Sequence, residues 1–260
     1  MAKPTPAQTA KQQDKGKKLV SAVERILASN ASIRATVAEA KAKAQAQGAA
    51  GKELRPATAK VLVKRYSDRA ALVGGASGLS ALVPGLGSLI WGMGGLLTEL
   101  AVLLKFEVEM ALCLSHLHGF DIETANERQL AFVMASVGTY DATGGNFFVD
   151  LARTEGQALW NYGPRQLAKF LITAATGVAL VWLSRGLLKL VPIIGVAVGS
   201  GMNKVLTKRV GDRIARDLAT RVSLAAEPTA ASAEKKTRAK KTTRPKKSKK
   251  PAPPDLKVAP

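Results

Sequence analysis

A phrase that the chain uses twice constrains its fold more than any other feature. Residues 78–87 (GLSALVPGLG) return as residues 186–195 (GLLKLVPIIG), so that 186 − 78 gives an offset of 108 positions. Each copy lies inside a long apolar stretch that is rich in glycine. Proline ends or kinks a helix, and glycine close behind it is typical of a turn. Each copy therefore predicts an apolar helix, a sharp turn and a second apolar helix. We expect the two hairpins to pack on each other or on a lipid surface.

Glycines spaced four apart accompany both copies. Gly74 and Gly78 precede the first turn, and Gly195 and Gly199 follow the second. Small residues at this spacing share a helix face and allow two helix backbones to approach closely. Glycine costs about 1 kcal/mol in an ordinary helix interior, so these positions require a compensating packing contact. The residues predicted to form the turns and close contacts are Gly74, Gly78, Pro84, Gly85, Gly87, Pro192, Gly195 and Gly199.

The first copy lies in a stretch of 29 residues, 70–98, that carries no charged side chain. A continuous apolar helix of this length could cross a bilayer. The turn at Pro84, however, leaves about 14 residues before it, or roughly 20 Å of helix, against the roughly 30 Å of a hydrocarbon core. The second arm is longer but contains Glu99. The hairpin is therefore expected to insert shallowly or to pack against protein rather than to span.

The rest of the chain predicts an all-α fold. No segment alternates apolar and polar residues as a half-buried strand would. Pro56 and Pro164 are expected near helix starts and Gly119 just after a helix end. Residues 32–47 are alanine-rich, so the predicted helix there can bury little. The expected organisation is a disordered segment 1–15, a helical extension 16–54, a helical domain 55–224 and a disordered Lys/Pro-rich tail 225–260.

The positive charge of the chain lies in its flanks. The net charge of +20 divides into about +10 over residues 1–65, −2 over 66–203, +4 over 204–224 and +8 over 225–260. An almost neutral apolar centre with basic arms is typical of a protein that meets an anionic polymer or an anionic membrane face. The alternative is that the arms are solvated and serve solubility alone.

A basic amphipathic helix is predicted directly after the second hairpin. Val210, Ile214, Leu218 and Val222 form a stripe at a spacing of four, and basic residues occupy the other faces. Such a helix binds anionic lipid through its charges and its apolar stripe. The tail lacks aromatic residues for stacking on bases, so its binding would depend on phosphate charge alone. The residues predicted to meet an anionic surface are Lys208, Arg209, Arg213, Arg216, Arg221, Lys240, Lys241, Lys246, Lys247, Lys249 and Lys250.

Residues that could carry chemistry are few. Cys113, His116 and His118 are potential zinc ligands, but Cys113 and His116 share a helix face that His118 does not, and no second cysteine exists. We expect the histidines to stand near the negative end of a helix instead. Glu99, Glu107 and Glu109 interrupt an apolar region, where an ionisable group is often functional. For Glu99, pairing with a nearby basic residue is favoured.

A polar set surrounds a predicted glycine-bearing loop. Paired carboxylates can perform acid–base chemistry, but no histidine or serine elbow supports them here, and capping or salt-bridge roles are favoured. An enzyme would require this set to line a pocket. No catalytic, cofactor-binding or metal-binding residue is predicted. The members of the set are Asp141, Asn146, Asp150, Arg153 and Glu155.

Three motifs resemble the EcsC family of bacterial proteins. They are residues 69–75 (RAALVGG) with the first Pro-Gly turn, residues 114–121 (LSHLHGFD), and residues 191–195 (VPIIG) followed by Gly199, Asn203 and 207–211 (TKRVG). The resemblance covers roughly residues 55–222 and does not include the tail. It implies a helical, membrane-associated protein of a family with no established molecular activity, so it supplies no catalytic residues.

These observations predict a non-enzymatic protein at the cytoplasmic side of the cell membrane, accessory to a transport or secretion system. Cys113 is the single cysteine, which excludes an intramolecular disulfide and fits a reducing compartment, and the polar N-terminus does not resemble a signal peptide. The expected partner is anionic lipid, and a membrane-protein partner or a homo-oligomer is left open. The alternative is a soluble helical protein that binds nucleic acid non-specifically through its tail. No cofactor is expected.

Overall fold

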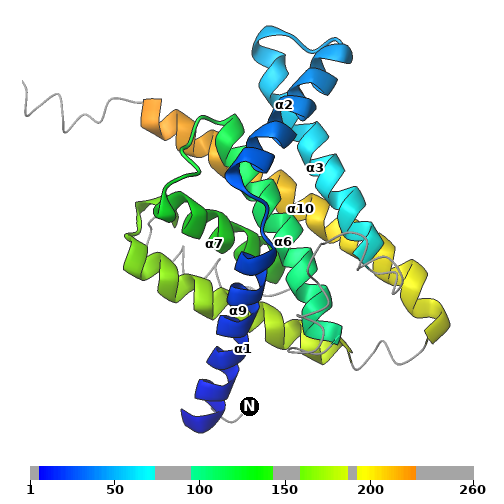
Figure 1. The fold of residues 1–260 in the computed structure, drawn as a ribbon, viewed down its shortest axis with the longest axis vertical. Helices are drawn as coiled ribbons and strands as arrows, with labels where there is room; N and C mark the ends of the chain where they lie inside the picture. Colours follow the sequence, from blue (N-terminus) through cyan, green and yellow to red (C-terminus); the bar gives the residue numbers. More distant parts are fainter. Residues whose placement is uncertain (1–5, 74–94, 143–158, 187–191, 227–260) are drawn as a thin grey trace, which may run out of the picture. The chain divides into compact units, whose positions relative to one another are not determined.

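The computed structural model describes residues 6–73, 95–142, 159–186 and 192–226, and all regular structure in these ranges is helical. The prediction of an all-α fold is confirmed for this part of the chain. Pro164 begins a helix as predicted, and Gly119, with φ of 88°, follows a helix end. In chain order (Figure 1) the helices are α1 Pro6–Ile26, α2 Asn30–Ala46, the short η1 Gly51–Glu53, α3 Leu54–Val73, α6 Gly95–Leu117, α7 Ala125–Ala142, the short η2 Leu159–Asn161, α9 Pro164–Gly186 and α10 Pro192–Ala226.

The N-terminal segment is more ordered than its composition predicts. Residues Met1–Arg221 form one compact unit, and Val222–Pro260 form a second, of which residues 222–226 are described as the end of α10. Helix α1 begins at Pro6, so the predicted disorder of residues 6–15 is wrong. Leu19 and Val23 are buried in the same core as residues of α3 and α6. The helical extension predicted for 16–54 is therefore part of the main unit, because its apolar face finds partners that its local sequence does not reveal.

Helix α6 is the centre of this unit. Every residue from Leu100 to Ser115 is buried, and α1, α2, α3, α7 and α9 all contact the helix. Figure 1 shows α6 passing between α7 and α3. A helix whose sides are mostly apolar is stable when it is buried all round, and here other helices of the same chain supply that burial. Burial of each large apolar side chain stabilises the fold by about 1.5–3 kcal/mol, so α6 is the main source of the core.

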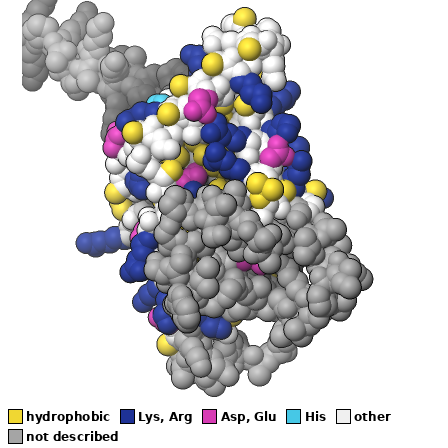
Figure 2. Space-filling view, turned by 45° about the vertical axis from the view of Figure 1, so that its right-hand side comes forward, with side chains coloured by type: hydrophobic (Ala, Val, Ile, Leu, Met, Phe, Trp, Pro, Cys, Tyr) yellow, Lys and Arg dark blue, Asp and Glu magenta, His cyan; other side chains and the backbone are white. Residues whose placement is uncertain are grey.

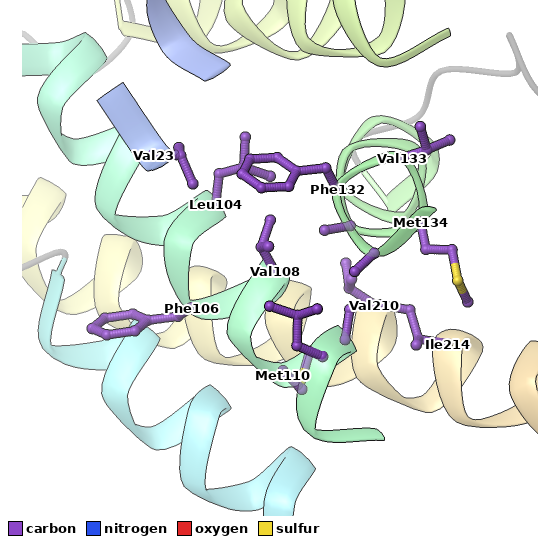
Figure 3. Packing of buried hydrophobic residues seen from close by; sticks show 14 of the residues in the cluster. Val23, Leu104, Phe106, Val108, Met110, Phe132, Val133, Met134, Val210 and Ile214 are labelled. Carbon is purple, nitrogen blue, oxygen red and sulfur yellow. The ribbon is translucent and has the colours of Figure 1, made fainter. Parts of the chain in front are cut away.

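The apolar stripe of the basic helix faces this core. Val210, Ile214 and Leu218 of α10 are at most 1% exposed. Figure 3 shows Val210 and Ile214 near Met134 of α7, and a Cβ atom added to Gly138 of α7 would lie 2.8 Å from Val210 Cγ1. The predicted stripe is confirmed at these three positions, and other helices of the same chain cover it. Their apolar surface is already covered by protein and is not available to a membrane.

Close helix contacts occur at glycines that the repeat did not indicate. A Cβ atom added to Gly16 in α1 would lie 2.2 Å from Thr176 Oγ1 and 2.9 Å from the carbonyl oxygen of Ile172, both in α9. A Cβ added to Gly211 in α10 would lie 2.7 Å from Met110 Sδ and 2.9 Å from Val63 Cγ2. Both separations are shorter than ordinary carbon contacts, so these glycines allow the helices to approach as they do.

The repeated phrase falls largely outside the described residues. This holds for Gly74, Gly78, Pro84, Gly85 and Gly87 of the first copy and for residues 187–191 of the second. Pro192 is the first residue of α10. Proline is tolerated there because a backbone N–H at this position would have no partner within the helix. Gly195 and Gly199 lie within the same helix, which continues for 35 residues to Ala226. The second apolar arm and the basic helix are therefore one continuous element.

Candidate functional site

The predicted anion-binding residues of α10 divide into exposed and structural ones. Lys208, Arg209 and Arg216 are exposed, and Lys208 Nζ pairs with Asp212 at 2.6 Å. Arg213, by contrast, forms an ion pair with Asp141 of α7. The six tail lysines of the prediction, from Lys240 to Lys250, lie outside the described residues. The described part of the basic helix therefore offers three of its five predicted cations to solvent.

Arg221 is a structural residue, contrary to the prediction. Its Nη1 atom lies 2.9 Å and 2.8 Å from the two carboxylate oxygens of Glu127, and its guanidinium carbon lies 3.8 Å from the ring centre of Phe120. The Arg221 side chain is 17% exposed and that of Glu127 is 5% exposed. A guanidinium that is stacked and paired in this way is held away from solvent. Arg221 therefore joins α10 to α7 instead of meeting an anionic surface.

An exposed apolar patch lies where α3 and α10 meet. Leu72 of α3 is 55% exposed, and Met202 and Val205 of α10 are 43% and 52% exposed. Lys204, which lies between the latter two in sequence, pairs with Asp68 of α3 at 2.7 Å. Asp68 is one helical turn before Leu72, so the ion pair joins the two helices at this patch. We call these residues, Leu72, Met202, Lys204 and Val205, the α3–α10 face.

A basic groove lies between α2 and α3. It has a volume of about 690 Å³, within the range of about 300–1,000 Å³ that small-molecule sites occupy. Figure 2 shows Lys and Arg side chains gathered in the upper part of the surface, with acidic side chains beside them. The groove, which we call the α2–α3 groove, was not predicted from the sequence. Its lining includes the cations Lys43, Lys60, Lys64, Arg65 and Arg69 and the carboxylates Glu39 and Asp68.

Two of the three glutamates that interrupt the apolar region are buried in α6. Glu109 pairs with Lys105 at 2.6 Å and accepts a hydrogen bond of 2.8 Å from the backbone N–H of Ala28. Glu109 is therefore neutralised by a basic neighbour on its own helix. Glu107 differs, because its carboxyl group contacts the hydroxyl groups of Thr139 in α7 and Thr207 in α10. Glu99, near the start of α6, is half-buried.

Burial favours the neutral form of Glu107. The Thr139 hydroxyl contacts Glu107 Oε2 and also lies 2.9 Å from the carbonyl oxygen of Ala135. A hydroxyl group has one hydrogen to donate, and a carbonyl oxygen can only accept. The Thr139 hydroxyl donates to an ionised Glu107 or to the Ala135 carbonyl, and a protonated Glu107 can donate to the Thr139 oxygen instead. Complete burial raises the pKa of Glu107 from 4.5 to about 7, against the hydrogen bonds of Thr139 and Thr207, which lower it.

Where the structure describes them, the other chemical candidates do not come together in a site. The Cys113 thiol lies 3.5 Å from the Tyr66 hydroxyl, and burial raises its pKa, so it is a poor nucleophile. The His118 ring nitrogen Nδ1 lies 2.8 Å from the carbonyl oxygen of Leu114 in the preceding turn. Within the described residues, no three His, Cys, Asp or Glu side chains are placed to hold a metal ion. Asp141 pairs with Arg213, and the rest of its predicted polar set, Asn146, Asp150, Arg153 and Glu155, lies outside the described residues.

No family model matches the chain, and neither a curated protein nor a solved structure is significantly similar to it. In the described ranges, no helix combines the length and the apolarity that crossing a membrane requires. Evidence on function therefore comes from the two surface features, the α3–α10 face and the α2–α3 groove. The groove and the face were found only in the structure, since each combines residues from two helices.

Proposed function

We propose that this chain is a non-enzymatic protein that attaches to the anionic face of a membrane, as an accessory to a transport or secretion system. We also propose, on the motifs quoted above, that it is a member of the EcsC family. The observation that carries the attachment is the α3–α10 face. Three large apolar side chains are exposed there beside Lys204, and solvent-exposed Lys208 and Arg209 follow along α10.

This combination is what a bilayer interface binds. Apolar side chains enter the boundary between headgroups and acyl chains, while lysine and arginine remain with the anionic headgroups. Each basic residue near an anionic surface contributes about 1 kcal/mol, and burial of a large apolar side chain contributes more. The position of Leu72 in the sequence supports membrane contact at the same face, because Leu72 lies near the start of the uncharged stretch 70–98. The basic tail would add long-range attraction that is weakened by salt.

Flotation with vesicles tests this proposal. Full-length protein is mixed with phosphatidylcholine vesicles with and without phosphatidylglycerol, and a chain that lacks residues 225–260 is compared with it. We expect both chains to float with the anionic vesicles, the shorter one more weakly. Substitution of Leu72, Met202 and Val205 by serine is expected to reduce vesicle binding by about tenfold or more.

The control for that variant is Leu224→Ser. Leu224 is 53% exposed, similar to Leu72, but does not belong to the α3–α10 face. The control should float like the unmodified chain. If full-length protein stays with the soluble fraction at low salt, membrane attachment is wrong. If deletion of 225–260 abolishes all binding and the same deletion abolishes binding to DNA, the tail-mediated nucleic-acid alternative is favoured instead.

A further inference from the structure

The α2–α3 groove exists because its floor is made of small side chains. Ala40 of α2 and Ala57 of α3 line it together with Val61. Ala40 and Ala44 of α2 are buried, so the contact between these helices is made without large apolar residues at those positions. The alanine-rich composition that limits how much α2 can bury thus also leaves space between the helices. This space is the α2–α3 groove, and longer charged side chains line it.

The carboxylates of the groove are already neutralised. Arg65 Nη1 lies 2.6 Å from Glu39 Oε2, and this hydrogen bond lowers the pKa of Glu39. Asp68 forms ion pairs with Lys204 and Lys64, whose Nζ atoms lie 2.7 Å and 2.5 Å from its carboxylate oxygens. Both hydrogen bonds lower the pKa of Asp68. Both groups are therefore ionised and matched by cations.

Positive charge remains in excess after these pairs are formed. Among the described residues, neither Lys43 of α2 nor Lys60 of α3 has a carboxylate partner, and both line the groove. Arg69 also lines it, with its guanidinium carbon 5.6 Å from the ring centre of Tyr66. Lys43 and Lys60, which come from opposite helices, and Arg69 therefore give the groove a net positive charge.

We propose that the α2–α3 groove binds a ligand that carries a terminal phosphate group, either a diphosphate or a phosphomonoester. A phosphomonoester carries about −1.5 to −2 charges at neutral pH and three acceptor oxygens, which match several cations at once. Arginine binds phosphate through two parallel hydrogen bonds and lysine acts as a point charge. No described lining residue is aromatic, so the groove has no platform for stacking bases. The site goes beyond membrane attachment, because a soluble ligand would bind it without a bilayer.

Titration calorimetry of the full chain with inorganic pyrophosphate tests the site. We expect one saturable site per chain, distinct from weak binding to the basic tails. The double variant K43Q/K60Q is expected to weaken this binding by about tenfold or more, since each lost lysine removes a charge-assisted hydrogen bond. The matched control is K41Q/K52Q, which removes the same charge from two exposed lysines outside the groove. All four lysines are exposed, so neither variant should shift the unfolding midpoint.

Equal weakening in both double variants, or no saturable binding by the unmodified chain, would overturn the site. A second arm identifies the source of the phosphate. Vesicles that contain phosphatidic acid, a phosphomonoester, are compared with vesicles that contain phosphatidylglycerol at the same mole fraction. Loss of a preference for phosphatidic acid in K43Q/K60Q supports a lipid headgroup, and an effect confined to pyrophosphate supports a soluble ligand. Failure of flotation alone contradicts the proposed attachment and leaves the pyrophosphate result intact.

Discussion

Replacement of Glu107 by glutamine should remove a large pH dependence from the stability of this protein. Glu107 is fully buried, and its pKa is raised from 4.5 to about 7 by the loss of solvation. Between these two values the unfolded chain releases the proton while the folded chain keeps it. The folded state therefore binds more protons, and its stability falls as the pH rises through this window. Each pH unit corresponds to about 1.4 kcal/mol, so the total loss is about 3 kcal/mol.

Glutamine reproduces the neutral carboxyl group. Its amide N–H can donate to Thr139 as the protonated acid does, and its carbonyl oxygen can accept from Thr207, whose hydroxyl oxygen lies 3.2 Å from Glu107 Oε1. The second amide hydrogen adds a constant cost if it finds no acceptor, and this cost does not depend on pH. The informative quantity is therefore the difference in unfolding free energy between Glu107→Gln and the unmodified chain, followed across the window.

Urea unfolding at pH values on both sides of the window measures this difference. We expect it to rise by about 3 kcal/mol in favour of Glu107→Gln from the acidic to the alkaline side. The control is Glu123→Gln, because Asn30 and Arg34 lower the pKa of the exposed Glu123 through hydrogen bonds. Its difference should not rise with pH. If the difference for Glu107→Gln stays constant or falls with pH, the inference that burial raises the pKa of Glu107 is wrong.

Two further predictions concern packing and pairing, and both are measured by urea unfolding. Gly16→Ala should lower the unfolding free energy by about 1–3 kcal/mol because Thr176 and the Ile172 carbonyl occupy the space. Gly201→Ala, with no atom within 4 Å, should raise it by up to about 1 kcal/mol, and a similar loss at both sites would contradict the close contact. Arg221→Ala should cost about 3 kcal/mol because it leaves the buried Glu127 unpaired, whereas Arg209→Ala at an exposed position should change stability by less than about 0.5 kcal/mol. Equal effects of the two substitutions would refute the structural role of Arg221.

Local signals in the sequence were sufficient for two helix boundaries and for the apolar face of α10. Pro164 and Gly119 mark a helix start and a helix end because proline and glycine impose their backbone preferences without help from distant residues. The stripe through Val210, Ile214 and Leu218 follows from the helical repeat alone. The charge distribution is likewise a property of composition. These features depend on neighbours along the chain, and they were predicted correctly.

The tertiary structure decided what each face meets. Helical spacing shows that α10 has an apolar stripe, but it cannot distinguish lipid from α6 as the surface that covers it, since both are apolar. Glu107 meets Thr139 and Thr207, which are 32 and 100 positions away in the sequence. The α2–α3 groove likewise arises between two helices, from small residues whose spacing alone does not indicate a hollow. Sequence periodicity thus determined which side of each helix is apolar or charged, while the fold determined its neighbour, because contacts between helices depend on distance in space and not along the chain.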